Sequence, residues 1–589
     1  MNHDILFVGT LKKGEEKIVS FADFKPIGET KGDIAISYSF DGQTYFDDFS
    51  INQTCLFLKI KAKSDTDVTI EEGHGFLFKK DEELSKRFER RTLWSGADGI
   101  YSFNLDEEED YDQKEANTLF VFGDTFVGTS LKNRKRLEPT KMVNNSLCYK
   151  KGDELNFFTK RDEDGAFISS FSLDEELTRS GYLPSNLTLN LGKDVKIKPY
   201  LSSLGEKETP VLVFDLHQVS EIKDVLITNF YDDSYGLKES FLRGVKELTI
   251  EVSSDGKHYE SLGNYTLALN EDGESSSFLH LNAKGRFVRF LLVRKEGMDE
   301  SDDAVGLNKV VFYDQNGPLS DVTTTGDSLS AYETTKSWFW LQDGYRKDDT
   351  LFIYPEIVQE ELNGIEGFEF KIRGVSEVQV KIKDGVLNLD EVKMREVPFY
   401  RLSEEVETIL GSAVLDNSRE DGYLYLYGYR NDRKAFLRSL IVGRIKKEDL
   451  GNYNELYFYS ENGWAREIEK AKPILPHVST EMSVIPLKDG YFKGKYLATF
   501  QYDSIGKWVS YSIGETPFGP FSNPCPLYFT PELNECTKTT YTYNAKAHLH
   551  LSSVDKILVS YNVNDMSMKA NKEDFTIYHP RFGYFVENK

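Results

Sequence analysis

Short alternating runs of apolar and polar residues recur along the chain and constrain its fold more than any other feature. IAISYSF and CLFLKIKA lie near the N-terminus, and GYLYLYGYR lies in the second half. A period of two places alternate side chains on opposite faces of a β-strand, and the Gly, Asp and Asn between runs favour turns. The chain also contains 33 Tyr and 40 Phe, which pack well on strands. The sequence therefore predicts an all-β protein.

The chain is too long for one hydrophobic core. Single cores stop growing at roughly 250–300 residues, and this chain has 589. Aromatic strands followed by Gly/Asp turns recur at intervals of roughly 50–70 residues, as expected for five four-stranded propeller blades. We therefore expect a five-bladed β-propeller, with an N-terminal β-sandwich-like module over 1–90, blade 1 over 91–165, an inserted jelly-roll β-sandwich over 166–320 and blades 2–5 over 321–589.

The inserted segment has a strand pattern of its own. VLVFDL, VKELTIEVSSDGKHYESLG, GRFVRFLLV and LNKVVFYD follow one another in this order. The pattern resembles the discoidin family, also called the coagulation factor 5/8 C-terminal type. The resemblance implies an eight-stranded jelly roll, a fold that often binds sugars or surfaces through loops at one end. We expect this unit to fold autonomously and to be dispensable for chemistry, because the acidic motifs lie outside it.

Charge and cysteine content exclude several partners. The net charge of −25 disfavours nucleic acid and anionic membrane surfaces. No run of 18 apolar residues predicts a membrane span. The four cysteines, Cys55, Cys148, Cys525 and Cys536, form no CxxC pair, and the N-terminus lacks the pattern of a signal peptide. We expect a cytoplasmic protein, and the oligomeric state stays open.

Several motifs outside the insertion point to a known group. They are WSGADGIYS, FGDTFVG, NNS, SWFW, GSAVL with GYLYLYG, TPFGPF, SYNVN and PRF. Together they resemble the bacterial propellers of domain-of-unknown-function families 5005 and 4185. Some relatives of family 4185 are endo-D-arabinanases, so the resemblance implies a five-bladed propeller acting on carbohydrate. The acidic stretch DEEEDYDQKE within the first unit is expected to be a solvated hairpin tip.

Three acids are the candidate catalytic residues. Glycoside cleavage uses two carboxyl groups, one of which protonates the leaving oxygen. Asp98 lies between small residues in GADG, Asp124 follows the apolar run LFVFG, and Glu481 precedes an apolar strand. Glu356 is a weaker candidate. A turn residue, a hydrogen-bond anchor or a strand cap is the alternative role for each acid.

Aromatic, amide and basic residues are the candidate substrate contacts. Indole faces can stack on sugar rings, although core packing explains them equally well. His548 and His550 share a strand face but lack a third ligand, so no metal or cofactor is expected, while a structural Ca²⁺ is compatible with the sequence. The predicted substrate-binding set is Trp94, Asn144, Asn145, Trp338, Trp340, His548, Asn562 and Arg581.

The sequence favours a glycoside hydrolase or transglycosylase acting on a furanosyl or related oligosaccharide or polysaccharide. A non-catalytic carbohydrate-binding protein is the first alternative. A cytoplasmic glycoside phosphorylase is the second, and it would need a basic phosphate cradle, for which Arg430, Arg444 and Arg581 are scattered candidates. GxSxG, P-loop, GxGxxG and HExxH motifs do not occur, so serine-hydrolase, nucleotide and zinc-protease chemistry lacks support.

Overall fold

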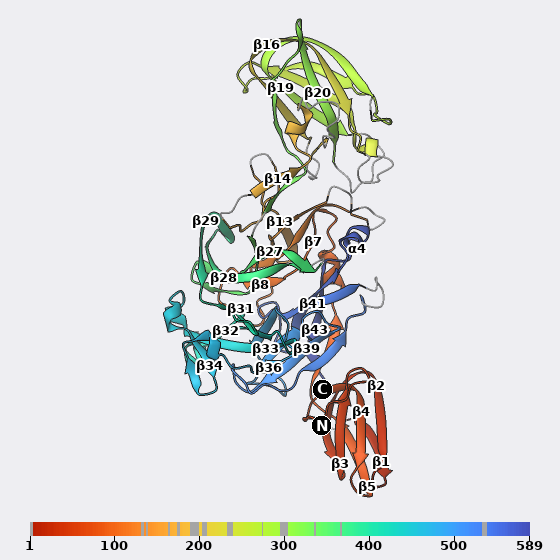
Figure 1. Cartoon of the computed structure of the whole chain (residues 1–589), viewed down its shortest axis with the longest axis vertical. Coiled ribbons are helices and arrows are strands. Elements are labelled where there is room, and N and C mark those ends of the chain that lie inside the picture. Colours follow the sequence, from red (N-terminus) through yellow and green to blue (C-terminus); the bar gives the residue numbers. More distant parts are fainter. Residues whose placement is uncertain are drawn as a thin grey trace.

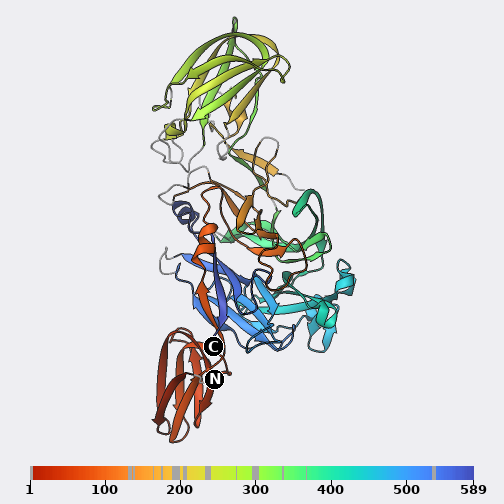
Figure 2. The ribbon, with the colours of Figure 1, turned by 180° about the vertical axis from the view of Figure 1, so that it is seen from behind.

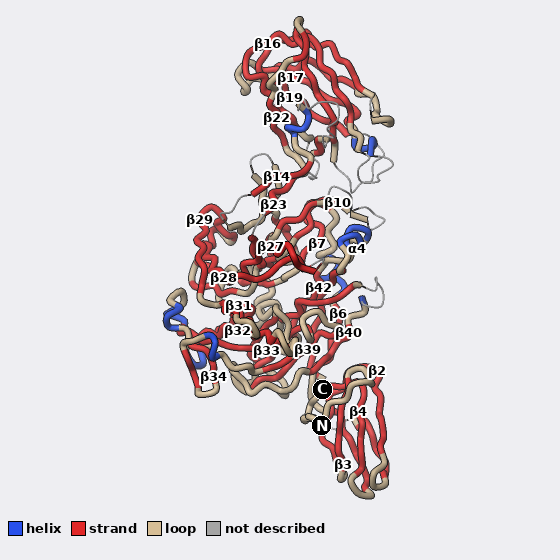
Figure 3. The backbone as a smooth tube through the Cα atoms, in the orientation of Figure 1, coloured by secondary structure: helices blue, strands red, loops and turns tan. Residues whose placement is uncertain are grey.

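The chain is built almost entirely from β-strands (Figure 3), which confirms the all-β prediction. The longest α-helices in the described part of the chain, α1 (Glu82–Arg87) and α4 (Met568–Glu573), have six residues each. The computed structural model describes residues 4–130, 135–136, 140–162, 165–173, 177–188, 199–202, 209–232, 240–273, 275–294, 304–334, 337–365, 368–532 and 539–588. Cys536 lies outside these ranges.

Three bodies follow one another along the long axis of the molecule (Figures 1 and 2). The N-terminal body is a five-stranded sheet in the order β1-β5-β2-β4-β3. Its apolar core also contains Tyr502 and packs against Trp508, both from the central body, so the two bodies share an interface. The strands are β1 (Ile5–Leu11), β2 (Glu16–Lys31), β3 (Ile34–Ser39), β4 (Thr54–Ala62) and β5 (Thr66–Glu72).

The central body contains five antiparallel sheets of four or more strands. The first sheet has the order β13-β12-β9-β8 and consists of β8 (Tyr101–Asn104), β9 (Thr118–Phe122), β12 (Ser146–Lys151) and β13 (Glu154–Phe158). The second comprises β24 (Ser337–Trp340), β25 (Gly344–Lys347), β26 (Thr350–Ile353), β27 (Glu356–Ile365), β28 (Phe368–Lys383) and β29 (Val386–Val397).

The remaining three sheets come from the C-terminal part of the chain. The third comprises β30 (Tyr400–Leu402), β31 (Val406–Asp416), β32 (Tyr423–Asp432), β33 (Leu437–Lys446), β34 (Tyr457–Ser460), β35 (Gly463–Ala465) and β36 (Leu475–Pro476). The fourth has β37 (Met482–Pro486), β38 (Tyr496–Gln501), β39 (Trp508–Gly514) and β40 (Cys525–Phe529). The fifth has β41 (Thr540–Ala547), β42 (Ile557–Asp565), β43 (Pro580–Glu587) and β6 (Phe76–Lys80).

Strand β6 joins segments from opposite ends of the chain. The sequence analysis placed its residues in the N-terminal module, but β6 pairs with β43, with Phe78 opposite Phe585. A separate small sheet, in the order β11-β10-β7, lies beside the first large sheet and consists of β7 (Thr92–Ala97), β10 (Thr125–Thr129) and β11 (Lys141–Val143). The chain turns between β9 and β10 at Asp124, which places this acid at the junction of two sheets.

The third body is a curled eight-stranded sheet at the other end of the molecule (Figure 1). Strands β14 (Leu177–Gly181) and β23 (Ser330–Thr334) pair as an antiparallel ribbon that connects it to the central body. The sheet contains β15 (Tyr200–Leu201), β16 (Val211–Asn229), β17 (Val245–Ser253), β18 (Glu260–Thr266), β19 (Ser276–Arg294), β20 (Gly306–Asp314), β21 (Gly317–Pro318) and β22 (Thr323–Gly326).

The curled sheet and the central body share a hydrophobic cluster. Val127 of β10 and Val143 of β11 pack in one group with Tyr182, Leu201 and Phe230. All five side chains are buried. Excising the third body would therefore expose apolar surface of the central body to water. This contact ties the third body to the small sheet β11-β10-β7 and bears directly on the expectation that the third body is dispensable.

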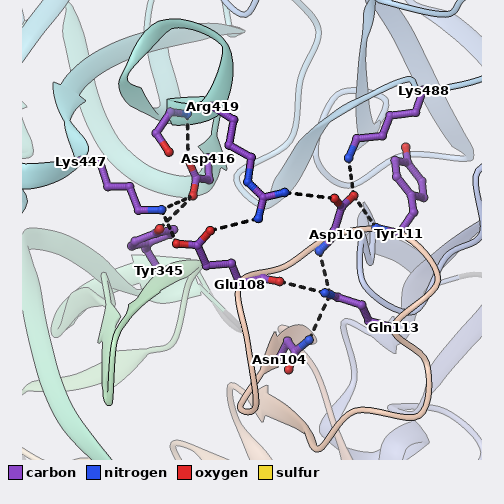
Figure 4. Close-up of polar contacts among 11 residues, drawn as sticks. Asn104, Glu108, Asp110, Tyr111, Gln113, Tyr345, Asp416, Arg419, Lys447 and Lys488 are labelled. Atoms are coloured by element: carbon purple, nitrogen blue, oxygen red, sulfur yellow. Dashed lines mark hydrogen bonds and ion pairs between the residues drawn. The ribbon is translucent and has the colours of Figure 1, made fainter.

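The acidic stretch 106–115 connects the antiparallel strands β8 and β9, and most of its residues are exposed, so the predicted hairpin tip is confirmed. Salt bridges also hold it against the protein as a strap, which the sequence did not indicate. Glu108 pairs with Lys447 and, at 3.3 Å, with Arg419 (Figure 4). Asp110 pairs with Lys488 and, at 3.6 Å, with Arg419. These cations lie in connections between strands of the third and fourth sheets, more than 300 residues away in sequence. Distant cations therefore neutralise the run of acids and hold it against the protein.

We expect Phe230→Ala to loosen the attachment of the third body. Truncating a buried phenylalanine costs about 3–5 kcal/mol. Calorimetry should show a lower unfolding midpoint, and proteolysis should cut more readily next to the β14–β23 ribbon. Phe278→Ala is the matched control, because Phe278 lies on the same sheet with 51% of its surface exposed. Equal behaviour of the two variants would contradict the shared core.

Candidate functional site

A cavity of about 80 Å³ lies where the five large sheets meet. Each sheet contributes residues of one strand to its lining: β8, β25, β31, β37 and β41. Glu108 and Glu109 of the strap also line it. Such a volume holds several water molecules among polar partners. The candidate site consists of acids on the same sheets, and two of them, Asp98 and Glu481, lie just before the lining strands β8 and β37.

Asp98 lies in the turn between β7 and β8 and accepts two phenol hydrogen bonds. Tyr543 donates to Oδ2 at 2.6 Å, and Tyr578 donates to the same oxygen at 3.0 Å. Burial and, to a smaller extent, the negative charge of Asp124 raise the pKa of Asp98 to about 7, against the opposing effect of the two phenol hydrogen bonds. Asp98 therefore keeps its proton to a pH at which ordinary carboxyl groups are ionised.

Asp124 lies next to Asp98 through Gly123. The Gly123 amide donates to the Asp98 carbonyl at 2.9 Å, and a β-carbon on Gly123 would lie 2.5 Å from Asp98 Oδ1. Asn144 donates to Asp124 Oδ1 at 3.3 Å, and the Trp340 indole donates to Oδ2 at 3.2 Å. Burial raises the pKa of Asp124 to about 6, and the two donors oppose the shift. The glycine gives the two carboxyl groups room to lie close together.

Glu481 directly precedes β37 and is held by Asn544. With its amide oriented to satisfy both neighbours, Asn544 donates to Glu481 Oε1 at 3.1 Å and accepts from the Gly99 amide at 3.0 Å. Thr480 also donates to the Glu481 carboxylate. The charge of Glu481 contributes to the raised pKa of Asp98. Glu481 thus belongs to the same electrostatic cluster as Asp98.

Glu356 is a fourth acid of this cluster. It opens β27, is 3% exposed and accepts a hydrogen bond from Tyr429 at 3.1 Å. Burial, reinforced by the charge of Glu481, raises the pKa of Glu356 to about 8. The sequence analysis ranked it below the other three acids, but the structure couples it to them.

The arrangement can hold acid and base forms of carboxyl groups together at neutral pH. Groups with raised pKa values can donate a proton to a leaving oxygen, while an ionised neighbour acts as nucleophile or activates water. Asp98, Asp124 and Glu356 have raised values of about 7, 6 and 8. Protonated and ionised carboxyl groups side by side are suited to cleaving an acetal, the bond that links two sugars.

Two predicted sugar contacts lie beside the acids. Asn144 and Trp340 are both partly exposed and both donate to Asp124. The Trp340 ring also meets Phe370 edge to face with ring centres 4.6 Å apart. Trp338 lies two positions earlier on β24 and is partly exposed on the same face of the strand. These residues border the cluster where a sugar ring could approach it.

Five other predicted substrate contacts are corrected to structural roles. Trp94 is buried and donates to Ser146, and Asn145 makes two bonds to the backbone of Phe171. His548 is enclosed between Ser102 and Ser560, each at 2.8 Å, and burial lowers its pKa well below its usual value, so the imidazole is neutral.

Asn562 and Arg581 also make contacts within the protein. Asn562 is fully buried and donates to the Ala97 carbonyl at 3.0 Å, which supports the turn of Asp98 without reaching a ligand. Arg581 was expected to pair with a channel acid. It instead donates to the Thr576 carbonyl at 2.6 Å and lies 3.7 Å from Glu532.

Sequence reasoning missed four residues of the site: Tyr543, Tyr578, Asn544 and Lys546. All four contact or face the acids from the fifth sheet or its connections. Tyr543, Asn544 and Lys546 lie in TYTYNAKAHLH, which looks like one regular alternating strand. An asparagine inside such a run was the available signal of an irregularity.

Among the described residues, no group of three or more His, Cys, Asp or Glu side chains is arranged to hold a metal ion. The helices within the described ranges are too short or too polar to cross a bilayer.

The chain belongs to the family described as Domain of unknown function (DUF5005). The family model matches residues 81–176 and 289–586, which covers most of the chain and includes the four acids. The resemblance to family 5005 is thereby confirmed. A search of curated proteins finds no match.

Solved structures with some similarity include carbohydrate enzymes. A candidate hydrolase from Bacteroides ovatus is 15% identical, with a TM-score of 0.45, and the alignment covers 86% of this chain and 89% of that one. The RS223 beta-xylosidase is 13% identical (TM-score 0.19; 43% and 93% covered). A GH43_1 enzyme from Xanthomonas citri in complex with xylotriose is 11% identical (TM-score 0.20; 43% and 88% covered). These TM-scores are below 0.5, so the function proposed below rests on the geometry of the site.

The raised pKa of Asp98 predicts a pH-dependent gain in stability for Asp98→Asn. Between about pH 4 and 7 the folded state binds a proton that the unfolded state has lost, so wild-type stability falls as pH rises through this window. Asp98→Asn has no titrating group at this position, so its stability does not fall for this reason as pH rises. We expect its advantage over wild type to grow by on the order of 1–4 kcal/mol from pH 4 to pH 8, measured by denaturant unfolding.

Asp349→Asn is the control for this measurement. Asp349 is exposed and pairs with Lys381 at 2.6 Å, which holds its pKa below the usual range. It should give no gain at high pH. A pH-independent difference between wild type and Asp98→Asn would show that Asp98 titrates normally.

Proposed function

We propose that this protein is a glycoside hydrolase or transglycosylase in which Asp98, Asp124 and Glu481, with Glu356 beside them, form the acidic catalytic set. One observation carries the proposal: four carboxyl groups from separate connections converge in one electrostatic cluster, three of them with raised pKa values. Glycoside cleavage needs such a combination of protonated and ionised carboxyl groups. The partly exposed Trp340 beside Asp124 supports a sugar ligand, because its ring can stack on a pyranose or furanose face.

The architecture behind this proposal is a five-bladed propeller with an inserted discoidin-like sandwich. The five large sheets would be the blades, since each places one strand against the central cavity. Contacts between β25 and β8, β25 and β31, β31 and β37, and β37 and β41 follow a cyclic order. Ser102 of β8 bonds to His548 at the end of the β41 segment and would close the ring. β6 would complete the fifth blade, and the N-terminal module would then comprise residues up to about Gly73.

Hydrolysis or transfer is favoured over phosphorolysis. A phosphorylase needs basic side chains that converge beside one acid. Arg430 donates to the Ala471 carbonyl, Arg444 packs between the rings of Tyr423 and Trp464, and Arg581 faces Glu532. These three arginines therefore form no common cradle. The furanosyl substrate class follows from the sequence resemblance to family 4185 and is part of the proposal.

We expect purified protein to release sugar from at least one glycan of a panel containing arabinofuranosyl, fructofuranosyl and xylosyl oligomers. Asp98→Asn, Asp124→Asn and Glu481→Gln should each lower kcat/KM by about 10²–10⁴-fold, because each removes a group that transfers a proton or stabilises charge. Circular dichroism should show an unchanged fold.

Glu469→Gln is the matched control, since Glu469 is exposed and pairs with Arg401 at 2.9 Å. The panel is run with and without phosphate. Full activity in the three acid variants would refute the assignment of the site, and strictly phosphate-dependent turnover would refute hydrolysis.

A further inference from the structure

The strand β41 contains an irregularity beside the acidic cluster. Its pairing with β42 is regular up to Tyr543 opposite Asn562 and resumes at Lys546 opposite Ser560. Asn544 and Ala545 thus oppose the single residue Tyr561, which defines a β-bulge. Asn544 has a φ of 62°, in the left-handed region that Asn tolerates better than most residues. Bulges next to active sites re-aim side chains.

Two successive residues at the bulge, Tyr543 and Asn544, make polar contacts with the acids or their turns. Tyr543 donates to Asp98 at 2.6 Å. Asn544 joins Glu481 to the Gly99 amide, which directly follows Asp98 in the chain. Asn544 therefore fixes the distance between Glu481 and the turn that contains Asp98.

Lys546 lies on the inner side of the bulge. Its Nζ donates to the Asn544 carbonyl at 3.0 Å and lies 4.3 Å from the centre of the Tyr101 ring. The side chain is 1% exposed. Its charge interacts with Glu481, Asp98 and Asp343, and burial lowers its pKa to about 8. The ammonium group thus lies between the acids and the cavity, which it also lines.

The charged and titratable groups around Lys546 come from several elements, and His548, two residues further along the chain, is one of them but is neutral. Asp98 and Tyr101 belong to the first sheet and its entry turn, Asp343 precedes β25, and Glu481 precedes β37. Asp343 accepts backbone bonds from Gly344 at 2.9 Å and Val414 at 2.7 Å. At a pH at which they are ionised, these acids outnumber the cation, so its removal would then leave their charges uncompensated in a buried setting.

We propose that the bulge over Tyr543–Lys546 is a positioning device for the acidic set: Asn544 fixes Glu481 relative to the turn of Asp98, and Lys546 supplies the positive charge that balances these two acids. Neither residue touches the reacting atoms. The effect on turnover rests on the function proposed above, whereas the coupling between these groups does not.

Two double-mutant cycles test the coupling without substrate. The first combines K546M with D98N, and the second combines N544G with E481Q. Glycine adopts the left-handed conformation without strain, so N544G removes the amide and keeps the bulge. At pH 8 we expect each cycle to deviate from additivity by about 2 °C or more in the unfolding midpoint. In the first cycle D98N should stabilise K546M more than it stabilises wild type.

The pH dependence separates charge balance from packing. At pH 4.5 Asp98 is protonated, so the coupling between Lys546 and Asp98 should disappear. K150M is the matched control, because Lys150 is also partly buried and bonds to a backbone carbonyl, that of Lys114, at 2.6 Å. K150M combined with D98N should be additive at both pH values. Additive behaviour of K546M with D98N at pH 8, or equal coupling at both pH values, would overturn the proposal.

Turnover gives the second readout. On an active glycan, K546M should move the acidic limb of the pH profile of kcat to higher pH, with KM changed less than about threefold. A residue that only supports packing would leave the shape of the profile unchanged. If the cycles show coupling but no glycan is cleaved, the proposed function fails and the positioning device stands. If a glycan is cleaved but the cycles are additive, the positioning device fails alone.

Discussion

Desolvation of carboxyl groups at one point of the central body is the constraint on which the rest of the site depends. A buried carboxylate is costly unless donors or cations compensate its charge. The protein provides phenols to Asp98, an indole and an amide to Asp124, and an amide to Glu481. These donors hold the three groups in place but do not restore the ordinary pKa values of Asp98 and Asp124. Because these pKa values stay raised, the carboxyl groups can still hold a proton near neutral pH.

The acids of the strap are compensated differently, by direct salt bridges to cations. Glu108 and Asp110 are also clustered acids, yet Arg419, Lys447 and Lys488 neutralise them directly (Figure 4). Glu108 and Glu109 line the cavity from that side. The acids of the strap are therefore neutralised by cations, and their salt bridges connect neighbouring sheets. The charges of the cluster around Asp98 and Asp124 are only partly compensated, and this cluster is the one suited to acid–base catalysis.

The sequence predicted the strand content and the key acids because both leave local signals. Alternating aromatic runs indicated the sheets, and Asp124 stood out because a carboxyl group follows five buried residues of β9. The hairpin tip was predicted correctly, but its salt bridges were not, because their cations lie 311 to 378 residues away in sequence. Tyr543, Asn544 and Lys546 were missed because the bulge changes which face of β41 each side chain occupies, and alternation alone cannot reveal one extra residue. The same limitation made the enclosed His548 look like a substrate contact.

The central claim is that carboxyl groups of the cluster stay protonated at a pH where ordinary acids are ionised. Infrared titration of wild type and of Asp98→Asn measures this directly, through the carbonyl stretch of protonated carboxyl groups. The account predicts a signal in wild type that persists at pH 6, disappears by about pH 9 and is reduced in the variant. If every carboxyl group of the wild-type protein has lost its proton by about pH 5, the electrostatic account of the site is wrong.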